Sequence, residues 1–153
     1  MTVSSMGTHV VTQIAVVVKD IDKAIEAYSR IFDLPKPEVH LTDPPEKAKG
    51  VYRGTPTTSR AKLAFFHMGQ VDIELIEPVG EDSVWYEVLA EKGEGVHHIA
   101  FQIKDTDGVT AFLDQNGIPT IQQGRYTGGM YSYVDSAPQL GVMLELLENF
   151  GQS

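Results

Sequence analysis

Two stretches of the chain repeat the same order of hydrophobic and polar positions. One begins at Gln13 and reads QIAVVVKDIDKAIEAY, and the other begins at His98 and reads HIAFQIKDTDGVTAFL. In each, apolar residues at alternate positions predict a β-strand, which runs into Lys-Asp and an aspartate that can cap a following helix. Apolar residues then recur at helical spacing. The pattern therefore predicts two copies of a strand followed by a helix.

Each half also closes on a similar strand, VDIELIEP at residues 71–78 and GVMLELLEN at residues 141–149. Candidate strands at residues 62–68 and 130–134 complete two modules that each read approximately βαβββ, at about residues 9–80 and 94–150. We therefore expect an α+β fold in which residues 1–153 form a single domain. Ser83 as N-cap and Gly93 as stop predict a helix at about residues 83–92 that links the modules.

The segment at residues 34–60 separates the first helix from the next strand and is rich in proline. It is interpreted as a loop, in which a short strand around residues 50–53 is one option. A long loop in a compact domain is often a lid or a binding loop. A surface insertion without a role is equally consistent with the sequence, and both interpretations stay open.

Composition narrows the choice of partners. The chain has 21 acidic and 12 basic residues, a net charge of −9 and no basic patch, which opposes binding to nucleic acid or to an anionic membrane. It has no cysteine, which excludes disulfides, thiolate metal ligands and a cysteine nucleophile. The N-terminal residues show no leader pattern, and the longest aliphatic run is too short to cross a bilayer. We expect a cytoplasmic protein that takes a small-molecule substrate.

Strand alternation places four polar residues on one face of the predicted sheet. Adjacent strand residues point to opposite faces, so if the aliphatic residues pack beneath the helices, Gln13, Glu74, His98 and Glu145 face the other side. His97 then falls on the packed side. An amide oxygen, an imidazole and two carboxylates suit a divalent ion such as Zn, Co, Ni or Mn. The repeat thus predicts a metal site, with His98→Ala losing metal and His97→Ala keeping it.

Taken one at a time, the four predicted ligands could each have an ordinary structural role. A single strand histidine is more often a hydrogen-bonded core or edge residue than a ligand. The two glutamates could be solvated on an open sheet face, as we expect for Glu77 and Glu148. Only the matched positions in the two repeats favour the metal site.

The sequence resembles the vicinal oxygen chelate superfamily over roughly residues 10–149. Within that superfamily, which includes glyoxalases, methylmalonyl-CoA epimerases and bleomycin-resistance proteins, three motifs look most like the epimerases. These are GEGVHHIAFQIKDTD, the preceding IELIEP with its linker helix, and TGG before LELLEN. The resemblance implies paired βαβββ modules that form a cupped mixed sheet around one divalent metal, and a homodimer.

The ligand set departs from the epimerase pattern at one position. The epimerases have histidine where this chain has Gln13, whereas zinc-type glyoxalase I enzymes use Gln, Glu, His and Glu, the set found here. The arginine and asparagine with which those glyoxalases bind glutathione are replaced here by Val17 and Pro78. The His-Pro-Lys run of many epimerases is also missing, and their general-base position falls near Leu63. Ligand identity and surrounding sequence therefore indicate different relatives.

Both groups of relatives remove a proton α to a carbonyl, which implies a metal-dependent isomerase or lyase. The leading expectation is an epimerase of a CoA thioester. A glyoxalase I-like lactoylglutathione lyase or another metal-dependent enzyme of the superfamily is the first alternative, and a non-catalytic resistance-type binding protein is the second. The glyoxalase resemblance makes Glu145 the first candidate for the base, followed by Glu74. Arg125 and the backbone amides of Gly128 and Gly129 are candidates for binding an anionic substrate.

Overall fold

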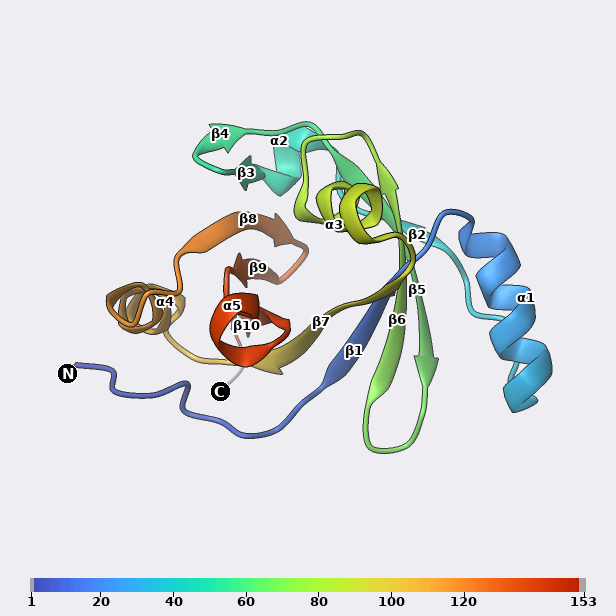
Figure 1. Ribbon diagram of the computed structural model, residues 1–153, viewed down its shortest axis with the longest axis horizontal. Helices are drawn as coiled ribbons and strands as arrows, with labels where there is room; N and C mark the ends of the chain where they lie inside the picture. The colour runs from blue at the N-terminus through green and yellow to red at the C-terminus, as the bar shows by residue number, and fades with distance from the viewer. Residues whose placement is uncertain (1, 152–153) are drawn as a thin grey trace.

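All strands of the structure belong to one curved mixed sheet (Figure 1). The computed structural model describes residues 2–151, so the domain boundaries expected at residues 1 and 153 lie outside the described part of the chain. The sheet has ten strands in the order β2-β5-β6-β1-β7-β10-β9-β8-β3-β4. In the described residues, no helix is long and apolar enough to span a membrane.

The two halves of the chain have equivalent strand orders. The first half contains β1 (Gln13–Val17), α1 (Ile21–Phe32), β2 (His40–Leu41), α2 (Pro45–Ala48), β3 (Val51–Tyr52), β4 (Thr55–Pro56), β5 (Arg60–His67) and β6 (Asp72–Val79). After α3 (Val84–Lys92), the second half contains β7 (Gly95–Gln102), α4 (Thr106–Gln115), β8 (Thr120–Tyr126), β9 (Gly129–Val134), α5 (Ala137–Leu140) and β10 (Met143–Asn149). The order β2-β5-β6-β1 matches β8-β9-β10-β7, and β1 pairs with β7 in antiparallel register. The expected α+β fold with two βαβββ modules in a cupped sheet is confirmed.

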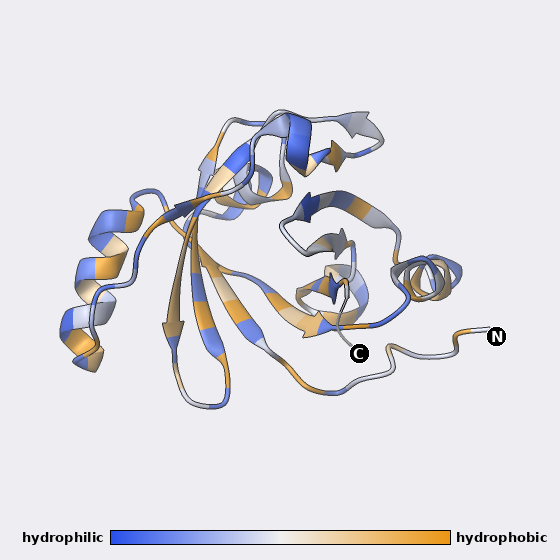
Figure 2. Cartoon of the chain, turned by 180° about the vertical axis from the view of Figure 1, so that it is seen from behind, coloured by the Kyte–Doolittle hydropathy of each residue, from blue (hydrophilic) through white to orange (hydrophobic). Residues whose placement is uncertain are grey.

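The helices of the two modules pack on the outside of the sheet. Figure 2 shows hydrophobic and hydrophilic residues alternating along the central strands, as a sheet with two different faces requires. Outer-face residues such as Leu75 pack with α1, and Leu144 and Leu146 pack with α4. The buried stripe of α1 ends before Ile31, which is 69% exposed although it continues the helical spacing of apolar residues.

The first turn of each of these helices is anchored by a glutamate from a closing strand. Glu77 Oε1 accepts a hydrogen bond from the backbone N–H of Ile21 at 3.0 Å, and Glu148 Oε1 accepts one from that of Thr106 at 2.9 Å. The expectation that both glutamates are simply solvated is therefore wrong. A carboxylate stabilises the free N–H groups and the positive end of a helix dipole, which explains a glutamate at both positions.

The segment at residues 34–60 joins the two modules at their far edges. It begins with β2 at one end of the sheet, and its β3–β4 hairpin forms the other end, where Val51 pairs with Gln123 of β8. The short strand expected around residues 50–53 is confirmed. The segment therefore crosses from one module to the other instead of standing off as a separate insertion.

The concave side of the sheet is closed at one end by α3. Ser83 caps this helix through a bond from the Tyr86 N–H, as the sequence predicts. Val84 and Trp85 are buried with Ala15, Ile76 and other residues of the inner face. The inner face is thus a core near α3 and an open cup elsewhere.

Candidate metal centre

The predicted ligands come from four adjacent strands at the middle of the sheet. Glu74, Gln13, His98 and Glu145 lie on β6, β1, β7 and β10, which are neighbours in that order. Their aliphatic neighbours, such as Leu75 and Leu144, pack on the outer face. Strand alternation therefore brings all four residues to the inner face.

Glu74, His98 and Glu145 form a compact buried cluster. Each offers a ligand atom, and these atoms all lie within 4.8 Å of one another. His98 Nε2 is 3.0 Å from Glu145 Oε1 and 3.4 Å from Glu74 Oε1. His98 is 0% exposed, Glu145 5% and Glu74 6%. Within residues 2–151, Glu74 Oε1 and His98 Nε2 are the buried side-chain polar atoms that make no hydrogen bond.

This arrangement fits a divalent metal ion. Buried polar atoms are nearly always hydrogen-bonded, so two converging atoms without partners need another explanation. An imidazole nitrogen and carboxylate oxygens are ligands that Zn, Co, Ni and Mn accept. Two carboxylates would also balance the charge of the ion, which makes their burial less costly.

The electrostatics of the cluster follow from burial and from its opposite charges. Burial raises the pKa of Glu74 above its ordinary value. Burial alone would lower the pKa of His98, but the charges of Glu145 and Glu74 outweigh it and raise that pKa to about 9. His98 without a metal is therefore protonated at neutral pH, and a metal bound at Nε2 would displace that proton.

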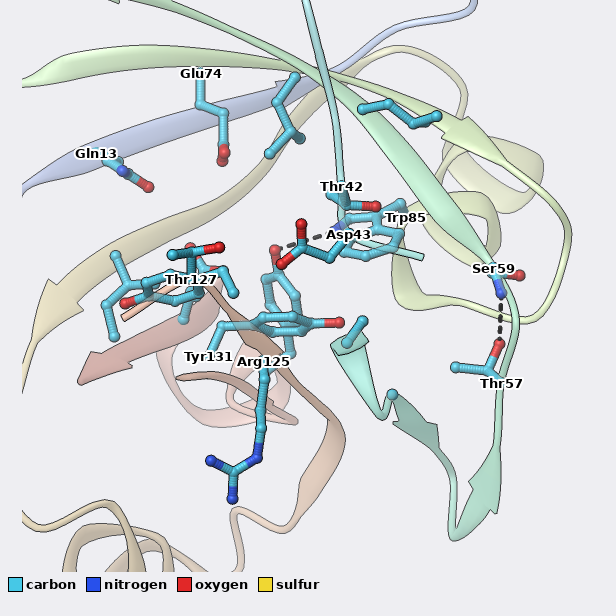
Figure 3. A pocket seen from close by; sticks show the side chains of 18 of the residues that line it. Gln13, Thr42, Asp43, Thr57, Ser59, Glu74, Trp85, Arg125, Thr127 and Tyr131 are labelled. Carbon is cyan, nitrogen blue, oxygen red and sulfur yellow. Dashed lines mark hydrogen bonds between the residues drawn. The ribbon is translucent and has the colours of Figure 1, made fainter. Parts of the chain in front are cut away.

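Gln13 lies beside the cluster and lines the same cavity as Glu74 and Glu145. Figure 3 shows its amide directed into the cavity next to the Glu74 carboxylate. The structure thus brings Gln13 to the wall of the site, and its role as a fourth ligand remains a prediction.

The placement of His97 differs from the expectation. In the pairing of β1 with β7, Ala15 is opposite His98 and Val16 is opposite Val96, so His97 is the extra residue of a β-bulge. A bulge interrupts the alternation of side chains, and His97 is buried on the same inner side as His98. The prediction that it faces the opposite side is wrong, and with it goes the reason for expecting His97→Ala to keep the metal. Burial lowers the pKa of His97 to about 3, with a further contribution from the charge of His98.

The cluster opens onto a cavity of about 420 Å³. Its wall is mainly apolar and aromatic, with Leu63, Phe65, Trp85, Tyr131 and Tyr133 among the lining residues. Trp85 Nε1 donates a hydrogen bond to the Tyr133 hydroxyl at 2.9 Å, the bond drawn behind Asp43 in Figure 3. Burial raises the pKa of Tyr131 to about 12 and raises that of Tyr133 well above its ordinary value, so both hydroxyls stay neutral.

A third carboxylate on the cavity wall was not found from the sequence. Asp43 follows β2 in the segment at residues 34–60 and lines the cavity together with Glu74 and Glu145. Figure 3 shows its carboxylate within the cavity. Nothing in the local pattern marks this residue, because it reaches the cavity only through the pairing of β2 with β5.

The residues predicted to bind an anionic substrate lie at the mouth of the cavity. Arg125 is in strand β8 and lines both the cavity and a neighbouring hollow, which Gly128, Gly129 and Lys47 also line. Its guanidinium lies 5.9 Å from the centre of the Phe150 ring. Figure 3 shows the side chain running away from Glu74, so the structure does not bring Arg125 to the cluster.

Comparison with known proteins agrees with this geometry. The model of the Glyoxalase/Bleomycin resistance protein/Dioxygenase superfamily matches residues 12–134. The chain belongs to this superfamily. An uncharacterized protein of Bacillus subtilis (strain 168), YqjC, is 32% identical over 104 residues, which cover 66% of this chain and 74% of that protein.

Solved structures of superfamily members share the fold. Methylmalonyl-CoA epimerase from Mycobacterium tuberculosis has a TM-score of 0.66 at 22% identity, covering 97% of this chain and 93% of that one. A variant of Streptomyces coelicolor methylmalonyl-CoA epimerase, in complex with 2-nitronate-propionyl-CoA, has a TM-score of 0.64 at 26% identity, covering 92% of this chain and 94% of that one. The similarity to epimerases expected from the sequence motifs is therefore confirmed.

Proposed function

We propose that this chain is a metal-dependent enzyme that removes a proton α to a carbonyl, most like an epimerase of a CoA thioester. The observation that carries the proposal is the buried cluster of Glu74, His98 and Glu145, whose two glutamates line the cavity. The similarity to methylmalonyl-CoA epimerase, at 26% identity and a TM-score of 0.64, supports the same class of reaction.

Glu74, His98 and Glu145 would hold the metal, with Gln13 as a fourth ligand from the adjoining strand. When bound, a divalent ion such as Zn, Co, Ni or Mn supplies Lewis-acid stabilisation of the negative charge that develops on a carbonyl oxygen. The protein contributes a site that excludes water, because all three clustered side chains are nearly inaccessible to solvent.

Glu145 is the proposed base, and Asp43 is the proposed source of the returning proton. An epimerisation removes a proton from one face of the α-carbon and delivers one to the other, so it needs two groups that exchange protons near neutral pH. The neutral tyrosines of the cavity are too weakly acidic for this, so their hydroxyls contribute hydrogen bonds only. The carboxylates that line the cavity are Asp43, Glu74 and Glu145, and burial disfavours the charged form of Glu74.

The shape of the cavity suits the acyl end of a larger molecule. Ligand pockets of about 300–1,000 Å³ enclose compounds of drug size, so a cavity of about 420 Å³ would take the acyl group and leave a CoA nucleotide outside. The hollow next to the mouth is lined by two cations, Arg125 and Lys47, by the backbone at Gly128 and Gly129, and by one carboxylate, Asp43. We propose that this hollow receives an anionic part of the substrate.

The donor set favours one second candidate, a glyoxalase I-like lyase. Gln13, Glu74, His98 and Glu145 reproduce the ligand types of the zinc-type glyoxalases that the sequence resembles. A binding protein without metal gives no use for two buried carboxylates that converge on a buried histidine, although burying such groups is costly.

Deuterium exchange tests the proposal. The protein, loaded in turn with Zn, Co, Ni and Mn, is incubated in D₂O with methylmalonyl-CoA, and uptake at the α-carbon is followed by mass spectrometry. Metal-dependent uptake is the expected result. Consumption of the methylglyoxal–glutathione hemithioacetal without thioester exchange would instead establish the lyase. If neither reaction is observed with any of the four metals, the proposed chemistry is overturned.

A further inference from the structure

Two adjacent buried histidines are joined directly through their rings. His97 Nδ1 lies 2.8 Å from His98 Nδ1, and His97 Nε2 lies 3.0 Å from the backbone carbonyl oxygen of Val84 in the first turn of α3. His97 is 3% exposed and His98 is fully buried. A continuous line of contacts therefore runs from the linker helix through His97 to the candidate ligand.

The directions of the hydrogen bonds along this line follow from which atoms can donate. A carbonyl oxygen can only accept, so His97 Nε2 must carry a proton. A contact of 2.8 Å between two Nδ1 atoms holds one proton, because two would point at each other. Either His98 donates to a neutral His97, or a cationic His97 donates to His98.

The surroundings decide between these two arrangements. A cationic His97 would be a buried charge, and in the described residues its hydrogen-bond contacts are the Val84 carbonyl and the His98 ring, neither of which is negatively charged. A buried charge without an opposite partner is strongly disfavoured. The proton between the rings therefore belongs to His98 Nδ1, which leaves Nε2 as the ring nitrogen that faces Glu74 and Glu145.

We infer that His97 is a positioning residue, which holds His98 with Nδ1 protonated so that the Nε2 lone pair is available to a metal between Glu74 and Glu145. The ring of Tyr133 assists, since it makes edge contacts with His97 at 5.7 Å and with His98 at 4.9 Å between ring centres. The β-bulge is what makes the arrangement possible, because without it His97 would point out of the cup. The hydrogen-bond pattern of His97 and His98 follows from their contacts alone. The role given to that pattern, the presentation of Nε2 to a metal, rests on the proposed metal site.

Nitrogen-15 NMR of the histidine side chains tests the pattern in the metal-free protein. We expect His97 to carry its proton on Nε2 only and His98 to be protonated at Nδ1. On addition of Zn²⁺, His98 Nε2 takes the chemical shift of a metal ligand while Nδ1 keeps its proton. A proton on His97 Nδ1 would overturn the inference. If none of Zn, Co, Ni and Mn binds, the proposed function fails, and the metal-free spectrum still decides the role of His97.

Two conservative variants separate positioning from packing. In His97→Asn, the amide oxygen occupies the place of Nδ1 and can accept from His98. In His97→Gln, the amide nitrogen occupies the place of Nε2 and can donate to Val84. Hydrogen-bond partners of metal-bound histidines contribute about 10–100-fold in affinity, so we expect His97→Phe to weaken Zn²⁺ binding by that factor. We expect His97→Asn to keep most of the Zn²⁺ affinity that His97→Phe loses, and we expect His97→Gln to lose it as His97→Phe does.

The affinities are measured by competition with a chromophoric chelator, and far-ultraviolet circular dichroism checks that each variant is folded. Equal losses in the Asn, Gln and Phe variants would indicate that only the packing of the imidazole matters and would overturn the inference. Unchanged affinity in His97→Phe would do the same.

Discussion

Glu74→Gln should separate metal binding from folding. The change removes a carboxylate whose Oε1 atom makes no hydrogen bond. Glu74 is 6% exposed, and its burial raises its pKa. Glutamine has nearly the same shape without the buried charge, so its cost in the metal-free fold is small. We expect the metal-free variant to unfold at a temperature no lower than the metal-free wild type.

The magnitude of the metal-linked effect can be worked out from linkage. A ligand at 100 times its Kd stabilises the folded state by about 2.7 kcal/mol. For a domain of this length, about 2–4 °C of Tm accompanies each kcal/mol, which gives an increase of about 5–11 °C for the wild type. The variant has lost one of three clustered ligands and should show little or none of this increase.

Differential scanning calorimetry with EDTA, and then with each of Zn, Co, Ni and Mn in excess, measures both quantities. Glu91→Gln is the matched control, because it makes the same chemical change on the exposed side of α3. The reasoning is refuted if no metal raises the Tm of the wild type, or if Glu74→Gln responds to metal as fully as Glu91→Gln.

Three further predictions concern the chemistry and the edge of the cup. Glu145→Gln should abolish deuterium uptake at the α-carbon while the circular dichroism stays that of the wild type, and full uptake would exclude Glu145 as the base. Asp43→Asn should keep metal affinity but slow epimerisation more than deuterium exchange, whereas equal rates for wild type and variant would remove Asp43 from the mechanism. Arg53, whose Nη2 lies 2.6 Å from Glu87 Oε1, lowers the pKa of Glu87. This ion pair contributes about 0.2–1 kcal/mol to the free energy of unfolding. The contribution is fully present above the ordinary pKa of glutamate and is lost as the pH falls through the lowered pKa of Glu87. Glu87→Gln should therefore flatten that part of the pH–stability curve measured by urea denaturation, and an unchanged curve would contradict this account.

Much of the sheet and of the site could be predicted because both depend on local periodicity. A strand buried on one face alternates its side chains, and the repeat of that alternation places Glu74, His98 and Glu145 at equivalent positions. Helix starts are equally local, as the cap at Ser83 illustrates, but α1 is capped by Asp20 of the Lys-Asp pair and not by the aspartate that follows the pair, as the pattern had suggested. These features need only the residues on either side of them.

The features that escaped prediction depend on pairing between distant segments. The bulge at His97 exists because β1 and β7 shift register between Ala15 and Val16, which no property of the GVHHIAF run requires. Asp43 reaches the cavity because β2 pairs with β5. Glu77 anchors a helix that lies 56 positions earlier in the chain. In each case the deciding contact joins residues that the sequence keeps far apart.

The β3–β4 hairpin has a consequence for the order of folding. Val51 and Tyr52 pair with Gln123 and Gln122, so the hairpin cannot find its partner until β8 of the second half has formed. Contacts between distant residues form slowly, because the entropy of closing the chain between them must be overcome first. The pairing of β2 with β5 holds the segment near Asp43, and this late pairing with β8 holds its other end, which includes further residues of the cavity wall such as Gly50. We therefore expect the wall to assemble only when the second half of the chain is folded, so that partly folded protein lacks a closed pocket and neither half forms one alone.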